Sequence, residues 1–396
     1  MGRFFPIFIL FHGCLAMFSQ ETSISYWDDS ETQIKEQFHY FTRGTELIRH
    51  GRYTIYYSNG NLWQEGSYEN GLMTGTWLDY YENGVLKQKL PYKRGKLNGK
   101  LYYYYPDATL YQETDYVNDI IHGTSLIYHP NGAINERASY QNGLLHGTVK
   151  GFHENGKERY VKQYIAGSET GSQVYYYENG KIMERFQMVQ GRYHGEYRGY
   201  YKDYKDGAIQ KICQYKYGVL HGDYQGYYPS GNPSVRCTYR NNKIEGDWIA
   251  YFDRLIADSI PVIRETGKYT EGCRTELWRS FYPDGKLYTI GQYENKKFTG
   301  DWTIYHPNGH IKQKGNYVDG MADGEFLMYY ESGSLKNRGI FMSDKKAGIW
   351  TTYYESGEIM TVIPFKNGVR HGEAKAYDKE GNVLEVSVYY NGDEIQ

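Results

Sequence analysis

Residues 75–95 read GTWLDYYENGVLKQKLPYKRG, and residues 348–368 read GIWTTYYESGEIMTVIPFKNG. In both stretches a glycine is followed by Trp two residues later and by a Tyr-Tyr pair from the fifth residue on. Tyr, Trp and Thr favour strands, whereas Asn-Gly and Ser-Gly favour turns, and no helical period competes with this pattern. Each stretch therefore predicts one β-hairpin.

The hairpin pattern recurs along most of the chain. From Gly51 onward a glycine marks the origin of each repeat, and eleven of the thirteen intervals between origins are 24 residues long. One interval of 27 residues ends at Gly222, and one of 30 residues ends at Glu276, where the glycine is lost. A fixed period of this kind is the signature of a repeat architecture.

An aromatic residue stands five positions after every repeat origin. Because this position is aromatic in every repeat, whether or not a ligand could reach it, we interpret the series as structural, stacking each hairpin on the next. The series is Tyr56, Tyr80, Tyr104, Tyr128, Phe152, Tyr176, Tyr200, Tyr227, Tyr251, Phe281, Tyr305, Tyr329, Tyr353 and Tyr377.

The predicted fold class is all-β, an elongated single-sheet antiparallel meander of about fourteen 24-residue hairpins. We expect Asn59-Gly60 and its equivalents to form type I′ hairpin turns, since both residues tolerate positive φ. The second turn of each repeat, such as Asn70-Gly71, is expected to be looser. No helix is predicted in the mature chain.

The first 19 residues resemble a secretory signal. An apolar run from Phe4 to Phe18 follows Arg3, and it is too short for a confident transmembrane helix. Cleavage after Ser19 is expected, which predicts a secreted or periplasmic protein with no transmembrane span. Lipid anchoring at Cys14 is disfavoured, because the FHGC context fits poorly and apolar residues continue after the cysteine. Residues 20–50 are interpreted as a lead-in and cap, and 51–396 as the repeat array.

Composition excludes several classes of protein. Tyr supplies 47 and Gly 46 of the 396 residues, so aliphatic residues are too scarce for one large Leu/Ile/Val core. Disorder is excluded because 17% of residues are aromatic and the net charge is only −2. The same balance argues against nucleic acid as a partner, since that needs a clustered basic surface.

No pattern singles out a catalytic, cofactor-binding or metal site, which predicts a non-enzymatic protein without cofactors. A histidine stands just before six repeat origins, but the slot holds Thr, Asn or Asp elsewhere, so a turn-forming role is expected. Cys213 and Cys237 are equivalent residues of adjacent repeats, ~10 Å apart, which is too far for a disulfide. With Cys273 they are predicted to be free. The histidines are His50, His122, His146, His194, His221 and His371.

From Gly51 to the C-terminus the units resemble the MORN-repeat variant family, whose bacterial arrays are often catalogued as YwqK-type antitoxins. The Tyr-Tyr-x-Asn-Gly core carries the resemblance, with Ala108 and Glu276 as departures from glycine. The resemblance implies an open β-hairpin array that acts in protein–protein contact, and neutralisation of a toxin partner in some members. The expected export signal separates this chain from a cytoplasmic antitoxin.

The two long intervals predict where a partner binds. Extra residues near 200–207 and 253–275 are expected to lengthen two hairpin tips, which emerge on one edge of the sheet. Neutral insertion into exposed turns is the alternative interpretation. The candidate partner edge comprises Lys202, Tyr204, Lys205, Arg254, Asp258, Arg264 and Glu265.

Three functions remain open at this point. The first is an exported scaffold for an unknown protein partner. The second is an antitoxin or immunity protein. The third is a carbohydrate- or cell-surface-binding module that uses exposed aromatic rings.

Overall fold

A computed structural model describes residues 20–204, 207–257 and 259–395, so the expected signal segment, with Cys14, lies outside the described residues. The chain divides into two compact units. Unit 1 comprises the described residues up to Thr170 together with Glu178–Gly180. Unit 2 comprises Gly171–Tyr177 and the described residues from Lys181 onward.

Unit 1 is built from β-strands, and each strand lies antiparallel to its partners. Residues 20–50, interpreted as a lead-in, supply β1, β2 and the start of β3 to the same sheet. The strands are β1 (Glu21–Tyr26), β2 (Ile34–Arg43), β3 (Glu46–Tyr56), β4 (Leu62–Glu69), β5 (Leu72–Tyr80), β6 (Leu86–Lys93), β7 (Lys96–Leu97), β8 (Gly99–Tyr104), β9 (Leu110–Val117), β10 (Ile120–Tyr128), β11 (Ile134–Gln141), β12 (Leu144–Leu145), β13 (Gly147–Phe152), β14 (Glu158–Ile165) and β15 (Ser168–Glu169).

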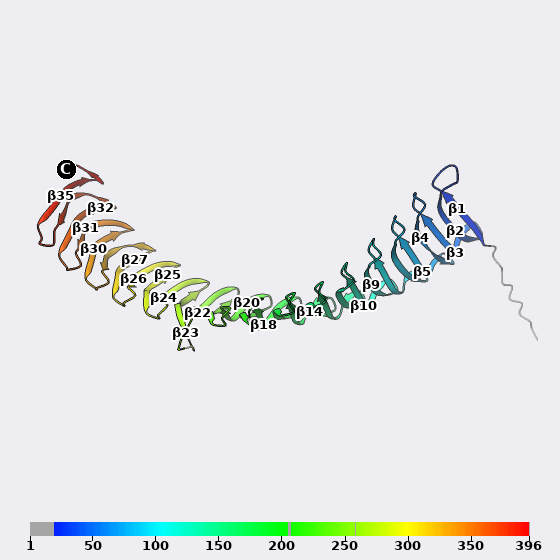
Figure 1. Ribbon diagram of the computed structural model, residues 1–396, viewed down its shortest axis with the longest axis horizontal. Coiled ribbons are helices and arrows are strands. Elements are labelled where there is room, and N and C mark those ends of the chain that lie inside the picture. Colours follow the sequence, from blue (N-terminus) through cyan, green and yellow to red (C-terminus); the bar gives the residue numbers. More distant parts are fainter. Residues whose placement is uncertain (1–19, 205–206, 258, 396) are drawn as a thin grey trace, which may run out of the picture. The chain divides into compact units, whose positions relative to one another are not determined.

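Unit 2 continues the hairpin pattern, and Figure 1 shows its hairpins following one another in chain order. The strands are β16 (Gly171–Tyr176), β17 (Ile182–Val189), β18 (Arg192–Tyr200), β19 (Ile209–Lys216), β20 (Val219–Tyr227), β21 (Pro233–Arg240), β22 (Lys243–Ile256), β23 (Ile260–Thr270), β24 (Cys273–Phe281), β25 (Leu287–Glu294), β26 (Lys297–Tyr305), β27 (Ile311–Val318), β28 (Met321–Ala322), β29 (Gly324–Tyr329), β30 (Leu335–Met342), β31 (Lys345–Tyr353), β32 (Ile359–Lys366), β33 (Val369–Arg370), β34 (Gly372–Tyr377), β35 (Val383–Tyr390) and β36 (Asp393–Glu394).

The predicted fold class is confirmed: the chain is an all-β antiparallel meander of hairpins. The part of the chain that the structure describes contains no helix, and hence none long and apolar enough to cross a membrane.

The two kinds of turn are the reverse of those predicted. Asn70 and Gly71 both have positive φ, 50° and 82°, and they join the directly paired residues Glu69 and Leu72. This two-residue loop is the type I′ turn. At the other turn only Gly60 has positive φ, and its N–H donates to the Tyr57 carbonyl at 3.0 Å. That geometry is a type I turn followed by a bulge at the glycine.

Asparagine serves a different purpose in the type I turn from the one expected. The Asn59 Oδ1 accepts a hydrogen bond from the Asn61 N–H at 2.9 Å, which closes the turn. Its Nδ2 donates to the Glu82 carbonyl of the next hairpin at 3.1 Å. Asn131 and Asn308 reach the following hairpin in the same way. The residue is therefore suited to this place by its side chain and not by tolerance of positive φ.

The buried side chains form aromatic rows across successive hairpins. In unit 1 the core cluster is Tyr53, Trp77 and Leu90, and the Trp77 indole meets Tyr68 edge-on at 5.0 Å. In unit 2 an unbroken series of edge-to-face contacts runs through Tyr269, Trp278, Tyr293, Trp302, Tyr317, Phe326, Phe341, Trp350 and Phe365. Aromatic pairs of this kind add about 0.5–1.5 kcal/mol each beyond burial. Stacking between repeats thus replaces a conventional core.

Candidate interaction edge

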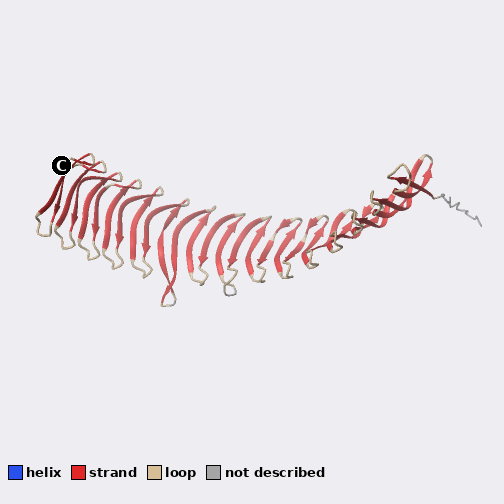
Figure 2. Cartoon of the chain, turned by 45° about the horizontal axis from the view of Figure 1, so that its top comes forward, coloured by secondary structure: helices blue, strands red, loops and turns tan. Residues whose placement is uncertain are grey.

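Both irregular repeats lengthen a hairpin on the same edge of unit 2, as the sequence predicted. The first links β18 to β19, and the second links β22 to β23, with one regular turn at 228–232 between them. The β22–β23 hairpin extends beyond its neighbours in Figure 2, because both of its strands are longer than usual. We call the described residues of the two lengthened tips, 201–204 with 207–208 and 252–257 with 259–262, the hairpin edge.

The first tip exposes two of the predicted residues, Lys202 and Tyr204. Tyr204 is 49% exposed, and its ring meets Tyr201 edge-on at 5.4 Å. The Lys181 Nζ donates to the Tyr204 carbonyl at 3.0 Å, which ties the tip to the preceding turn. Lys205, like Asp258 of the second tip, lies outside the described residues.

The second tip exposes Arg254 and a pair of aliphatic residues. Ile256 and Ile260 lie directly opposite each other and are 47% and 58% exposed. Leu255 pairs with Pro261 one step nearer the sheet. The tip therefore presents apolar surface beside a cation, and sequence reasoning did not single out this isoleucine pair.

Arg264 and Glu265 do not belong to the tip, which corrects the prediction. Glu265 pairs with Ala250 in the body of the sheet, and its carboxylate forms an ion pair with Arg274 at 2.8 Å. Arg264 lies at the bulge beside Tyr251, where each regular repeat has an equivalent residue. The extra residues are inserted before these positions, so spacing alone had drawn the candidate edge too far along the chain.

A row of side chains behind the type I turns, mostly tyrosines, links most repeats to the next. The Tyr57 hydroxyl donates to the Tyr80 carbonyl at 2.9 Å, and Tyr330 donates to the Tyr353 carbonyl at 2.8 Å. The contact recurs in at least eleven of the repeats that the structure describes, twice through a histidine Nε2. Phe252 stands at this position in the long hairpin and has no hydroxyl to donate. The second Tyr of the Tyr-Tyr pair was the available signal for this row.

Three of the six histidines before the repeat origins stabilise turns in the predicted way, whereas the Nδ1 atoms of His194 and His221 are buried without a hydrogen-bond partner in the described structure. The Nδ1 atoms of His50, His122 and His371 each accept a hydrogen bond from the first N–H of the next type I′ turn, at 3.2, 3.4 and 3.3 Å. Asp323 accepts the same bond in another repeat. Within the described residues no cluster of His, Cys, Asp and Glu could hold a metal ion.

The three predicted free cysteines are unpaired in the structure. Cys213 and Cys237 are both buried and lie on either side of Tyr224, so a whole strand separates them. Burial raises the pKa of the Cys237 thiol to about 12.

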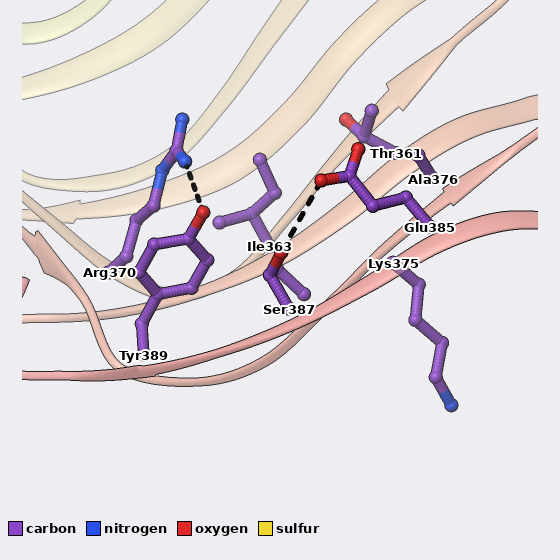
Figure 3. Close-up of a pocket in the computed structure, with 9 residues that line it drawn as sticks. Thr361, Ile363, Arg370, Lys375, Ala376, Glu385, Ser387 and Tyr389 are labelled. Carbon is purple, nitrogen blue, oxygen red and sulfur yellow. Dashed lines mark hydrogen bonds between the residues drawn. The ribbon is translucent and has the colours of Figure 1, made fainter. Parts of the chain in front are cut away.

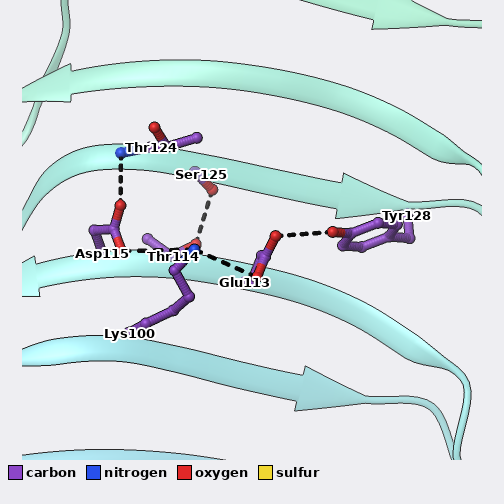
Figure 4. A network of polar contacts seen from close by, with 7 residues as sticks. All are labelled: Lys100, Glu113, Thr114, Asp115, Thr124, Ser125 and Tyr128. Atoms are coloured by element: carbon purple, nitrogen blue, oxygen red, sulfur yellow. Dashed lines mark hydrogen bonds and ion pairs between the residues drawn. The ribbon is translucent and has the colours of Figure 1, made fainter.

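A polar network replaces the aromatic row in one repeat of unit 1 (Figure 4). Thr114 and Ser125 are buried, and their hydroxyls share a hydrogen bond of 2.8 Å. The Tyr128 hydroxyl donates to Glu113 at 2.8 Å, and Lys100 lies 3.5 Å from the same carboxylate. The polar groups of these side chains are hydrogen-bonded or ion-paired with one another, so we interpret the network as structural.

A hollow of about 140 Å³ lies near the end of unit 2 (Figure 3). Its small lining residues include Ala374, Ala376 and Ser387, and the Arg370 Nη1 donates to the Tyr389 hydroxyl at 3.0 Å across one side. Lys375 points away from the other labelled side chains (Figure 3). Each of its three charged lining residues already has a partner: Arg370 contacts Tyr389, Lys375 contacts Glu373, and Glu385 contacts Ser387.

The fold defines a class: a repeat protein built from β-hairpins. The model of the MORN repeat variant family matches ten segments that together cover more than half of the chain. The chain therefore belongs to the MORN repeat variant family. The matched segments are 49–70, 73–94, 121–142, 145–165, 169–189, 220–241, 277–295, 298–319, 322–341 and 346–367.

No curated protein sequence matches the chain. Among solved structures, a Tc holotoxin pore of Photorhabdus luminescens is 10% identical, with a TM-score of 0.16, over 96% of this chain and 24% of that chain. The TcdB2–TccC3–Cdc42 structure is 11% identical, with a TM-score of 0.13, over 87% and 23%. This chain thus spans about a quarter of the matched chains. At such TM-scores these matches carry no functional argument.

Proposed function

We propose that the protein is an exported, non-enzymatic scaffold that binds a protein partner through the hairpin edge of unit 2. The observation that carries the proposal is that both departures from the 24-residue period lengthen tips on one edge. Insertions in repeat proteins map to loops on one face, which is often the binding face.

The exposed chemistry of the two tips supports a protein partner. Tyr204 supplies an aromatic ring, Ile256 and Ile260 supply apolar area, and Lys202 and Arg254 supply charge. Interfaces between proteins combine apolar or aromatic anchors with a polar rim in this way. Two exposed aromatic rings are less open to a sugar because each packs against another ring: Trp63 stacks on Tyr57, and Tyr217 packs on His194.

A loop replacement tests the hairpin edge. Residues 252–262 are replaced by His-Pro-Asn-Gly-Ala, the sequence of the regular turn at 129–133, which restores the 24-residue period. The partner protein captured by the wild type from periplasmic extract should be lost, while a matched variant with Asp284→Ala in a regular turn of the same edge retains it. Unchanged capture by the shortened protein contradicts the proposal.

Export is tested separately from binding. Intact-mass measurement of protein recovered outside the cytoplasm should show removal of about the first 19 residues. Unprocessed protein in the cytoplasm, together with rescue of cells from a neighbouring toxin, favours the antitoxin alternative. Binding to a glycan array in place of protein capture favours the carbohydrate alternative.

A further inference from the structure

The type I′ turns of unit 1 lie along one edge of its sheet, and this edge carries a row of exposed aliphatic side chains. Each side chain lies over the glycine of the next turn: a Cβ added to Gly95 would meet Leu72 at 3.3 Å, and one added to Gly143 would meet Ile120 at 3.5 Å. Leu144 contacts the following turn in the same manner. Leu72, Ile120 and Leu144 are nevertheless 50%, 49% and 50% exposed. We call this row the aliphatic ridge.

A turn with three cations interrupts the aliphatic ridge. Lys93 and Lys96 lie directly opposite each other at the end of β6 and in β7, and Arg94 lies between them in the turn. Lys96 occupies the ridge position between Leu72 and Ile120. Like charges directly opposite each other destabilise an antiparallel pair.

The backbone of this turn is also unfavourable for its sequence. Arg94 has φ 53°, in the left-handed region, whereas the equivalent places at 24-residue steps in unit 1 hold Asn70, Asn118, Asn142 and Ala166. Arg94 is thus one of two departures from Asn in this series, and the only one that adds a charge. Asn tolerates this conformation better than Arg because its short side chain can hydrogen-bond locally. Residues whose conformational or charge preferences conflict with their place in the fold, and which no contact within the chain offsets, are expected at functional sites.

No ion pair compensates the three cations within the described part of unit 1. Asp119, in the next turn, uses its Oδ1 to accept a hydrogen bond from the Leu97 N–H at 2.7 Å. Glu113 and Asp115 lie instead against Lys100, at 3.5 and 4.0 Å. Lys93, Arg94 and Lys96 are all exposed, so their charges are available to a partner.

We propose that this edge of unit 1 binds a protein segment in which acidic residues are flanked by aliphatic residues. Carboxylates of the segment would pair with Lys93, Arg94 and Lys96, and aliphatic side chains would cover Leu72 and Ile120. The inference rests on the proposed scaffold function but uses a different unit and a different edge from the hairpin edge.

The spacing of the ridge sets the pattern of the segment. Equivalent residues of adjacent repeats are two strands, or ~10 Å, apart. A segment in the polyproline II conformation rises ~3.1 Å per residue with three residues per turn, so every third side chain faces the same way, about 9 Å from the last. Its acidic and aliphatic side chains would therefore recur about every third residue. Nucleic acid and anionic lipid fit less well, because the cations are confined to one turn between apolar neighbours.

Peptide display tests the inference with a defined probe. A library of random peptides is selected on the full chain and counter-selected on the triple variant Lys93→Glu, Arg94→Glu and Lys96→Glu. The selected peptides should carry Asp or Glu between Leu, Ile or Val. Affinity should fall about tenfold or more in the triple variant and in Leu72→Ser with Ile120→Ser.

The matched control reverses three cations on the same kind of edge in unit 2, Lys296→Glu, Lys345→Glu and Lys366→Glu, and should leave peptide affinity unchanged. Peptides without acidic residues, or equal loss of affinity in the control, would overturn the inference. So would binding of polyuridylate or phosphatidylserine vesicles that depends on Lys93 but not on Leu72. The shortened hairpin variant should still bind the peptides, which separates this result from failure of the hairpin edge.

Discussion

The Trp77 indole occupies the space above Gly66 that a side chain would fill. A Cβ built on Gly66 would fall inside the Trp77 ring, closer than any real Cβ approaches. The ring is fully buried, and its Nε1 donates to the Ser67 carbonyl at 3.2 Å. Three residues of β5 bulge opposite Gly66, which gives the indole room to lie flat.

The same relationship recurs wherever a glycine precedes a large aromatic residue by eleven positions. Further pairs are Gly267 with Trp278, Gly291 with Trp302, Gly315 with Phe326, and Gly339 with Trp350. Trp248 shows what happens without the glycine. Cys237 stands at that place, and the Trp248 Nε1 is buried with no hydrogen-bond partner in the described structure.

Gly66→Ala should destabilise the first repeats of unit 1 by about 1–3 kcal/mol, because an added methyl group must displace the Trp77 ring. Chemical denaturation followed by tryptophan fluorescence measures the change. Gly199→Ala is the matched control: its Cβ would have its nearest neighbours at 3.5 Å, so it should be tolerated. Equal stability of the two variants would contradict the packing argument.

The sequence predicted the repeat and its aromatic rows because the same glycine and aromatic positions recur in nearly every 24-residue unit. It predicted the turn types wrongly, since Asn-Gly suits both a two-residue loop and the end of a three-residue loop. Only the pairing of the flanking residues, Glu69 with Leu72 against Tyr56 with Leu62, distinguishes them. The offset of eleven residues between Gly66 and Trp77 was visible in the sequence, but its meaning depends on the bulge.

Ala108→Gly should stabilise unit 1 by about 1 kcal/mol. Ala108 has φ 70° at the turn position where other repeats have glycine, and a left-handed conformation costs a residue with a Cβ about 1–2 kcal/mol. Thermal unfolding measures the gain. The reverse substitution in the preceding repeat, Gly84→Ala, should lose a similar amount because Gly84 has φ 82°. A loss of stability in Ala108→Gly would refute the interpretation.

Stability should fall in alkaline solution as the partly buried tyrosines ionise. Burial, with the hydrogen bond to Glu65, raises the pKa of Tyr80 to about 12 from 10.0, and Tyr128 beside Glu113 is raised to about 12 as well. Since the folded pKa exceeds the unfolded one, this stabilisation is complete below pH 10 and disappears as the pH rises through 12. Tyrosinate absorbance should show these groups titrating late in the native protein. Denaturation midpoints that do not fall above pH 10 would disprove the expectation.

The hairpin edge was only partly predictable from the sequence. Counting residues located the two insertions, but it could not show that Glu265 is already paired with Arg274 inside the sheet. Their separation along the chain does not reveal this ion pair, because the register between β23 and β24 brings the two side chains together. Ile256 and Ile260 were missed for the same reason, since only the register places them opposite each other.

Local unfolding should be visible in the reactivity of the cysteines. Burial raises the pKa of both Cys213 and Cys237, so iodoacetamide should modify the half-exposed Cys273 first. Gly267→Ala displaces Trp278 and weakens the hairpin next to Trp248 and Cys237, and it should speed alkylation of Cys237.

The control for this experiment is Gly66→Ala, which introduces the same clash in unit 1. In an array whose repeats depend on their neighbours, that variant should leave the alkylation rate of Cys237 unchanged. Peptide mapping by mass spectrometry follows each thiol separately. If both glycine variants accelerate Cys237 equally, the two units unfold together, and nearest-neighbour stacking does not describe the stability of this chain.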